Sequence, residues 1–273
     1  MTLLAILLGT LIAGVGSVWL AAALSFGLLA RYTQHMLSLA AGALLAVAFM
    51  NLLPEAFESQ HSAKDLFMTL LGGLLLFFLL DKAELWHHGH EHRQVASADA
   101  AERQPQEAGH DAHEHGHHGP QAPVSGSWAV LAGDTVHCVG DGLLIASAFV
   151  ADLRLGVVAS LAVLMHEVPH HMGDLALLRH LSSDRKVAVV KVSLAGATTA
   201  LGGLAGYWLV DSLRDYLPYF LVVASSSFVY VALADLIPQL QKRLGARQTL
   251  AQIAWLALGV ALVTAVGALA PGH

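Results

Sequence analysis

The sequence predicts an all-α integral membrane protein with eight transmembrane helices. Of its 273 residues, 56% are hydrophobic and only 12% are charged, whereas soluble domains carry about 25% charged residues. A helix needs about 20 apolar residues to cross a hydrocarbon core of ~30 Å. Eight stretches reach that length: 3–29, 35–57, 65–86, 126–150, 155–179, 187–210, 216–239 and 249–270.

The basic residues predict an orientation in the membrane. Of the 14 Lys and Arg residues, 11 lie in or beside four alternate loops: Arg31, Lys82, Arg93, Arg103, Arg179, Arg185, Lys186, Lys191, Lys242, Arg243 and Arg247. Loops rich in Lys and Arg remain in the cytoplasm. We therefore expect a multi-pass protein of the cell (inner) membrane with both termini outside and these four loops inside.

One of these loops is polar and rich in histidine. Nine of the 17 His residues lie in it: His87, His88, His90, His92, His110, His113, His115, His117 and His118. Its few apolar residues cannot form a core, so we expect disorder. His-rich tracts bind metals, although a solvated linker with incidental His is the alternative. The predicted organisation is helices one to three (1–86), a cytoplasmic His-rich loop (87–125) and helices four to eight (126–273).

The fifth apolar stretch contains the segment "LMHEVPHHMGDLAL", which places five ionisable side chains inside a predicted membrane helix: His166, Glu167, His170, His171 and Asp174. A charged side chain near the bilayer centre costs at least ~2.5–3.5 kcal/mol on insertion scales. Residues four apart share a helix face, so His166, His170 and Asp174 form one row, and Glu167 and His171 form a second. Imidazole and carboxylate together suit divalent transition metals.

The fourth stretch, "GDTVHCVGDGLLIASAF", repeats this pattern. His137 and Asp141 are four residues apart, Cys138 adjoins the histidine, and Asp134 lies one turn earlier. A helix–helix hydrogen bond could explain one such pair, but two adjacent helices with matched pairs indicate an ion. Cys138 has two interpretations that the sequence leaves open: a thiolate ligand or a small apolar core residue.

These segments resemble the ZIP (Zrt/Irt-like) metal transporters. "HEVPHHMGD" is similar to the HExPHxxGD signature of their fifth helix, and "HCVGDG" to the HNxxDG motif of their fourth. "AAGALLAVAFMNLLPEA" and "SSSFVYVALADLIPQL" resemble their second and seventh helices. The resemblance implies an eight-helix carrier that moves divalent metals into the cytoplasm through a two-metal site on helices four and five. Zn²⁺ is the expected substrate, with Fe²⁺, Cd²⁺ and Mn²⁺ as alternatives, and no cofactor is expected.

The resemblance also implies a set of metal ligands. The residues that match the family's ligands are His137, Asp141, His166, Glu167 and His170. Asp174 closes the signature of the fifth helix and joins the candidate metal site. His171 occupies a slot that varies in the family and is often Glu, so it is not among the candidates.

The sequence departs from the family pattern at two candidate positions. Cys138 stands where Asn is usual, which would make the site softer, and Asn51 stands where many relatives have His. Asn51 and Glu55 are expected to line the ion path, although Glu55 could equally be a carboxylate at a helix end. These three residues complete the candidate metal site.

An enzyme is the alternative function. "HEVPH" at 166–170 satisfies HExxH, in which two His bind zinc and the Glu acts as general base of a metalloprotease. Pro169 interrupts the regular helix which that motif needs, and no third ligand is evident, so we expect a transporter and no enzymatic activity. The expected partners are divalent metal ions and the lipid bilayer, with no nucleic acid, and the sequence leaves a homodimer open.

Overall fold

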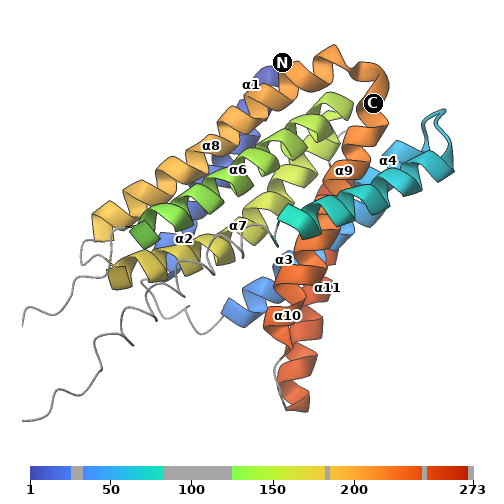
Figure 1. Cartoon of the computed structure of the whole chain (residues 1–273). Coiled ribbons are helices and arrows are strands. Elements are labelled where there is room, and N and C mark those ends of the chain that lie inside the picture. Colours follow the sequence, from blue (N-terminus) through green and yellow to red (C-terminus); the bar gives the residue numbers. More distant parts are fainter. Residues whose placement is uncertain (26–32, 81, 83–124, 182–184, 242–244, 270–273) are drawn as a thin grey trace, which may run out of the picture.

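The computed structural model describes residues 1–25, 33–80, 82, 125–181, 185–241 and 245–269. Throughout this part of the chain the regular structure is helical, with no strand. Figure 1 shows the helices gathered into one bundle. The predicted His-rich loop, 87–125, lies outside the described residues except for Ser125.

The described residues form eight long helical segments. The first segment consists of α1 (Thr2–Leu11), a π-helical turn (Ile12–Gly16) and α2 (Ser17–Ser25). The second consists of α3 (Thr33–Val47), a π-helical turn (Ala48–Leu52) and α4 (Leu53–Phe57). The third is the helix Ala63–Leu80, and the fourth is α6 (Ser125–Ala151). The fifth and sixth segments are α7 (Leu153–Leu181) and α8 (Arg185–Ser212). The seventh consists of a 3₁₀ turn (Arg214–Tyr216), α9 (Leu217–Tyr230), a π-helical stretch (Val231–Leu236) and α10 (Ile237–Leu240). The eighth is α11 (Ala246–Leu269).

Seven of these eight segments are long and apolar enough to cross a membrane. The exception is α7, which is 29 residues long but carries the ionisable segment and so falls short in hydropathy. The predicted stretches 126–150 and 155–179 match α6 and α7 to within two residues at each end. The predicted all-α membrane fold is confirmed.

The irregular turns of the long helices have local causes. Pro54 and Pro238 each follow a π-helical stretch, Ala48–Leu52 and Val231–Leu236. Proline lacks an N–H and its ring clashes with the carbonyl four residues earlier, so the preceding turn widens while the helix continues. At the start of α7, Asp152 caps the helix, because its Oδ1 accepts a hydrogen bond of 2.8 Å from the backbone N–H of Arg154.

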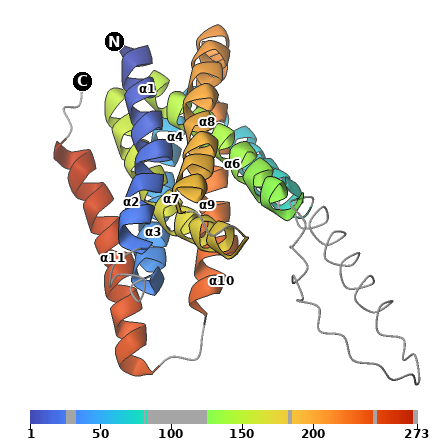
Figure 2. The ribbon, with the colours of Figure 1, turned by 90° about the vertical axis from the view of Figure 1, so that its left-hand side faces the viewer.

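The helices pack in two sets. In the first set, α6 packs against both α7 and α8, while α1 and α2 lie along α8 and α7. These helices run side by side across Figure 1, and Figure 2 shows α1 and α2 next to α7 and α8. In the second set, α3 packs against α11 and α9. The two sets meet where α3 contacts α7 and where α9 contacts α6.

Close backbone contact joins α6 to α8. A Cβ at Gly142 would collide with the carbonyl oxygen of Thr199, and a Cβ at Gly202 would collide with that of Val139. Small residues let helix backbones approach in this way inside membranes. The position of α6, and of the side chains it presents to α7, is therefore tightly constrained.

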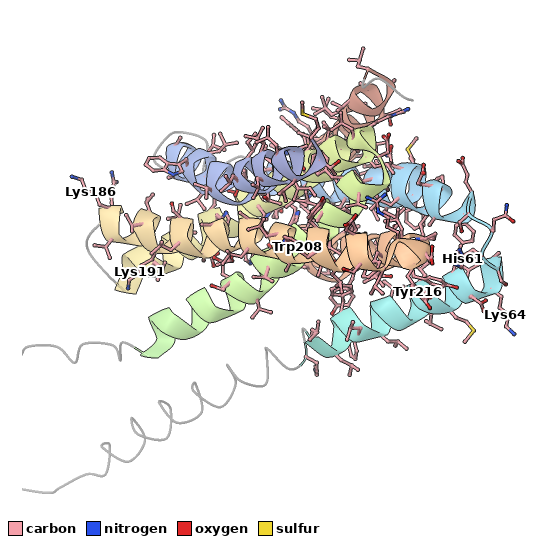
Figure 3. The ribbon with its side chains drawn as sticks, turned by 90° about the horizontal axis from the view of Figure 1, so that it is seen from above. His61, Lys64, Lys186, Lys191, Trp208 and Tyr216 are labelled. Carbon is pink, nitrogen blue, oxygen red and sulfur yellow. The ribbon has the colours of Figure 1, made fainter. Side chains whose placement is uncertain are left out.

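The basic residues of two loops lie at opposite ends of the bundle. Figure 3 shows Lys186 and Lys191 at one end, and Lys64 with His61 at the other. The orientation predicted from charge requires this separation, because it assigns Lys186 and Lys191 to the cytoplasm and Lys64 to the outside. Which end faces the cytoplasm remains a prediction.

Candidate metal centre

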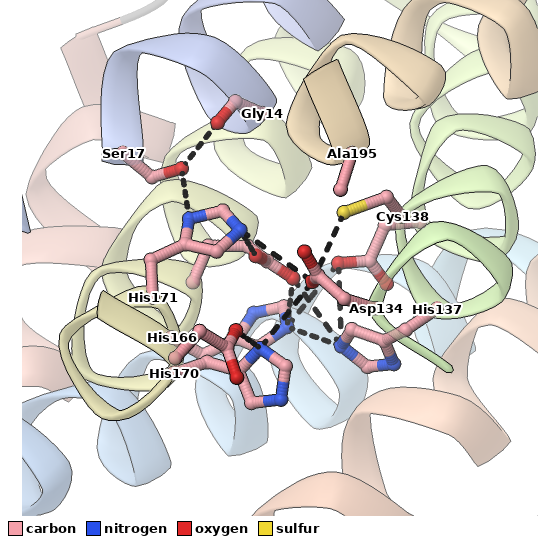
Figure 4. Close-up of polar contacts among 12 residues, drawn as sticks. Gly14, Ser17, Asp134, His137, Cys138, His166, His170, His171 and Ala195 are labelled. Carbon is pink, nitrogen blue, oxygen red and sulfur yellow. Dashed lines mark hydrogen bonds and ion pairs between the residues drawn. The ribbon is translucent and has the colours of Figure 1, made fainter. Parts of the chain in front are cut away.

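The ionisable side chains of α6 and α7 face each other inside the first set of helices (Figure 4). The α6 residues lie three, four and seven positions apart, so they form one stripe along the helix: Asp134, His137, Cys138 and Asp141. The stripe on α7 contributes His166, Glu167, His170, His171 and Asp174. Their ligand atoms form three overlapping groups, in each of which all ligand atoms lie within 4.8 Å of one another.

The first group consists of His137, Asp141, His166 and Glu167. His166 Nε2 lies 3.2 Å from Asp141 Oδ2 and 3.5 Å from Glu167 Oε1. His137 Nε2 lies 3.3 Å from Glu167 Oε1 and 3.4 Å from His166 Nε2. Ligands bound to tetrahedral zinc at ~2.0–2.1 Å stand roughly 3.3 Å apart. These four separations match the edges of a zinc coordination tetrahedron, whereas His137 Nε2 and Asp141 Oδ2, which share α6, lie 4.0 Å apart.

A backbone contact orients one imidazole of the first group. His166 Nδ1 lies 3.3 Å from the carbonyl oxygen of Ala162. A carbonyl can only accept, so Nδ1 carries the proton and Nε2 presents its lone pair to Asp141 and Glu167. Metal-ligating histidines are held in this way, by an outer partner that fixes the tautomer.

The second group consists of Asp134, Cys138, Glu167 and His171, all of them buried. His171 Nε2 lies 3.0 Å from Glu167 Oε2 and 3.6 Å from Asp134 Oδ1. Cys138 Sγ also lies 3.6 Å from Asp134 Oδ1. Glu167 faces the first group with Oε1 and the second with Oε2, so a single carboxylate can bridge two ions.

The third group consists of Asp134, His170, His171 and Asp174. His170 Nδ1 lies 3.7 Å from Asp134 Oδ1 and 3.6 Å from Asp174 Oδ2. This group is the most open of the three, because the side chain of His170 is 39% exposed and that of Asp174 is 14% exposed. It shares Asp134 and His171 with the second group, so one ion at a time can use those two ligands.

Several buried polar atoms of the three groups have no hydrogen-bond partner among the described residues: Asp134 Oδ2, Asp141 Oδ2, both carboxylate oxygens of Glu167, His171 Nε2 and Asp174 Oδ2. Buried charges are costly unless they are paired or coordinate a metal. Most of these atoms are lone-pair donors that face one another. A divalent cation among them would satisfy donors that the protein alone leaves unsatisfied.

The structure brings together seven of the nine predicted site residues: His137, Cys138, Asp141, His166, Glu167, His170 and Asp174. Their role as ligands stays a prediction. Sequence reasoning left out Asp134 and His171, which complete the second and third groups. A signal for both was present, because Asp134 lies four residues before Cys138 and His171 four residues after Glu167.

The other two predicted residues, Asn51 and Glu55, lie on the continuous segment formed by α3, the π-helical turn and α4, and Glu55 belongs to none of the three groups. Asn51 lies in the π-helical turn before α4, where its Nδ2 donates a hydrogen bond of 3.4 Å to the carbonyl oxygen of Ala46. Glu55 is exposed on α4. A place for these residues along the ion path stays a prediction.

Comparison with known proteins identifies the family. A family model described as ZIP Zinc transporter matches residues 1–267. The chain belongs to the ZIP family. It is 28% identical to Zinc transporter ZIP13 of Pongo abelii over 283 residues, which cover 94% of this chain and 76% of that protein. It is 29% identical to Zinc transporter ZIP4 of Homo sapiens over 259 residues, which cover 77% of this chain but only 39% of that protein.

Membership of the ZIP family confirms the resemblance found in the sequence. ZIP proteins are membrane transporters and not enzymes, so the metalloprotease interpretation of "HEVPH" finds no support. In ZIP transporters the metal is the transported substrate and not a cofactor, which agrees with the expectation that no cofactor is needed.

Proposed function

We propose that this ZIP protein carries divalent transition metal ions, zinc foremost, across the membrane into the cytoplasm. We further propose that the first group of α6 and α7 binds the travelling ion. The observation that carries this proposal is the meeting of two imidazole nitrogens with two carboxylates, at 3.2–4.0 Å, inside a membrane bundle. Four such donors from two helices form a site that a bare divalent ion can enter and leave.

The donor set favours zinc over harder ions. Mg²⁺ and Ca²⁺ prefer oxygen ligands alone, whereas imidazole suits Zn²⁺, Fe²⁺ and related ions. Zn²⁺ accepts tetrahedral four-coordination without a geometric preference of its own. The names of the relatives, zinc transporters ZIP4 and ZIP13, agree with this choice.

The first group is also accessible. The side chain of His137 is 32% exposed, while that of Asp141 is 4% exposed. An ion can therefore exchange its water for His137 first and then reach the buried carboxylates. Because all the ligands lie on α6 and α7, movement of this helix pair against the remaining bundle would carry the ion from one membrane face to the other. Pro169 lies inside α7 between His166 and His170, where it removes one backbone hydrogen bond of the helix.

The proposed direction of transport rests on the distribution of Lys and Arg residues among the loops. Lys186 and Lys191 mark one end of the bundle (Figure 3), and basic loops remain in the cytoplasm. The third group and the His-rich loop would then receive the ion on the cytoplasmic side, with both termini outside. A homodimer in the membrane is compatible with this proposal and is not required by it.

Flux into proteoliposomes that hold the purified protein tests the proposal. Zn²⁺ and Fe²⁺ entry should exceed that of protein-free vesicles and should be lost in Asp141→Asn, which keeps the side-chain shape but removes the charge. The matched control is His61→Ala, since His61 contacts Ser59 and Tyr219 and belongs to none of the three groups. Wild-type flux equal to that of empty vesicles, or full flux in Asp141→Asn, would refute the proposal.

A further inference from the structure

An apolar pocket lies beside the connection between α8 and α9. It has a volume of about 480 Å³, and its lining residues are Leu213, Tyr216, Tyr219, Phe220 and Val223. Ligand sites typically have volumes of ~300–1,000 Å³ and a predominantly hydrophobic and aromatic lining. The pocket shares no residue with the three groups of α6 and α7. It therefore has the size and the chemistry of a site for an apolar ligand, apart from the metal centre.

The pocket is a strip along one face of the 3₁₀ turn and α9. Tyr219, Phe220 and Val223 follow Tyr216 by three, four and seven residues, and residues with this spacing share a helix face. With a rise of 1.5 Å per residue, the strip from Tyr216 to Val223 is roughly 10 Å long. Tyr216 is 58% exposed and Leu213 is 40% exposed, so the pocket opens at the surface of the bundle. Its shape suits one extended hydrocarbon chain.

The place of the pocket in the membrane indicates what fills it. Tyr216 lies at the same end of the bundle as Lys64 (Figure 3), and tyrosine is enriched where a membrane meets water. Val223 lies deeper, inside the apolar span to which α9 belongs. The pocket therefore runs from the headgroup region towards the hydrocarbon core. At that depth the molecules that surround the protein are lipids.

The side chains at the mouth of the pocket carry both signs of charge. Arg214 lies between Leu213 and Tyr216 in the chain. Its Nε and Nη2 donate hydrogen bonds of 2.9 and 2.7 Å to Asp211 Oδ1. A guanidinium group has five N–H donors, so the others remain for a phosphate oxygen. Asp215 adds an exposed carboxylate. A headgroup with a phosphate and an ammonium group complements this set, whereas a headgroup with a phosphate alone meets an excess of negative charge.

We propose that this pocket binds one phospholipid with an ammonium headgroup, phosphatidylethanolamine. One acyl chain lies along Phe220 and Val223, the phosphate accepts hydrogen bonds from Arg214, and the ammonium group donates to Asp215. Tyr216 lines the pocket between chain and headgroup, because its side chain is apolar along the ring and polar at its tip. A quaternary choline headgroup has no N–H to donate to the carboxylate, so phosphatidylcholine is the weaker ligand.

The bound lipid lies at the junction of the two sets of helices. The 3₁₀ turn Arg214–Tyr216 contacts both α8, of the first set, and α9, of the second. Close backbone contact at Gly142 and Gly202 joins α8 to α6, so movement of α6 is transmitted to α8 and to this junction. Occupancy of the pocket therefore alters the rate of zinc entry. This consequence rests on the proposed transport function, whereas the existence of the lipid site does not.

Native mass spectrometry of the delipidated full-length protein tests the site. Titration with phosphatidylethanolamine should show one lipid bound, with a higher affinity than for phosphatidylglycerol of the same acyl chains. Leu213→Trp places an indole in the pocket and should abolish this binding. The matched control is Leu201→Trp, the same change at an exposed position of α8 outside the pocket, which should leave the binding unchanged.

The headgroup contact is tested by a milder change that leaves the pocket intact. Asp215→Asn keeps the size of the side chain and removes its charge. The preference for phosphatidylethanolamine over phosphatidylglycerol should fall by ~2–5-fold, the contribution of an exposed charge pair. The control is Asp235→Asn, because Asp235 is an exposed carboxylate of the π-helical stretch after α9. An unchanged preference in Asp215→Asn would overturn the assignment of the ammonium group.

Zinc entry into vesicles tests the consequence for transport. The wild-type rate should differ between phosphatidylcholine vesicles with and without phosphatidylethanolamine, while the rate of Leu213→Trp should be the same in both. A wild-type protein that binds phosphatidylethanolamine but transports zinc at one rate in both kinds of vesicle would overturn this consequence and leave the site intact.

The remaining outcomes decide the site itself. A folded wild-type protein that binds no phosphatidylethanolamine, or equal binding by Leu213→Trp, would overturn the site whatever the flux. A dimer that dissociates in Leu213→Trp, with no lipid bound to the wild type, would show that a second copy of the chain fills the pocket. Lipid binding as expected, without zinc flux in any vesicle, would confirm the site and overturn the proposed transport function.

Discussion

Two helix pairs of this bundle pack in different ways. Where α3 meets α11, the backbones touch at glycines: a Cβ at Gly42 would collide with the carbonyl oxygen of Leu256, and a Cβ at Gly259 with that of Leu39. Where α6 meets α7, nine ionisable or thiol side chains face one another, several of them buried without hydrogen-bond partners.

The difference supports the place at which we propose that an ion binds. The α3–α11 contact is made by backbone approach at glycines and by the stacking of His35 on Trp255, and it contains no member of the three groups. The α6–α7 contact gathers carboxylates and imidazoles at 3.0–3.7 Å. Removing these ionisable groups from water costs free energy, and only a bound cation or added protons can offset that cost. We therefore assign the α3–α11 pair to the scaffold and propose that the α6–α7 pair carries out transport.

The largest expected effect comes from removing a ligand of the first group. His166→Ala should abolish zinc uptake, with a loss greater than the ~10–100-fold that follows from losing an outer partner, because both Asp141 and Glu167 face this ring. Initial rates of zinc entry into proteoliposomes provide the measurement. His61→Ala, outside the three groups, is the control, and His166→Ala at wild-type rate would contradict the account.

A substitution that disrupts the α3–α11 contact should lower the stability of the protein and leave zinc binding unchanged. Gly42→Ala forces a Cβ against the backbone of α11, and overpacking of this kind costs about 1–3 kcal/mol. The temperature of thermal unfolding in detergent should therefore fall by several degrees. The zinc affinity of the folded protein should stay unchanged. Gly72→Ala is the control, since no atom lies within 4 Å of a Cβ there. Equal unfolding temperatures for the two variants would show that the α3–α11 contact is not tight.

A smaller effect is expected at the open end of the ionisable stripe. His170 contacts Asp134 and Asp174 but belongs to neither the first nor the second group. His170→Ala should therefore lower the maximal rate of zinc flux while leaving the affinity for zinc unchanged. Parallel flux and equilibrium binding measurements separate these quantities. A loss of affinity with an unchanged rate would instead make His170 a ligand of the travelling ion.

The smallest effect on transport is expected from the His-rich loop. Deletion of residues 87–118 removes all nine of its histidines but none of the residues of the three groups. The initial rate of zinc entry should be retained, and the response of uptake to internal zinc should change. Complete loss of flux in a folded deletion variant would mean that the loop is part of the ion path.

Much of this molecule could be predicted from its sequence. Apolar length alone located α6 and α7 to within two residues, because a membrane helix must satisfy its backbone within its own segment. The spacing of four residues placed His166 with His170 and His137 with Asp141, because it follows from helix geometry.

The sequence could not predict which faces of the helices contact one another. Which face of α7 turns towards α6 decides that His171 joins Asp134 and Cys138, and this depends on packing with other helices. The contact between Ser17 and His171 joins residues 154 apart, so no local pattern reveals it. For the same reason, nothing in the segment around Glu55 could show that this carboxylate lies outside the three groups.

Anomalous diffraction from zinc-soaked crystals of the full-length protein tests the central claim most directly. The account predicts a zinc ion within about 2.0–2.2 Å of His137 Nε2, His166 Nε2 and an oxygen of Asp141, with Glu167 beside it. A well-ordered protein whose zinc peaks all lie away from α6 and α7 would contradict it.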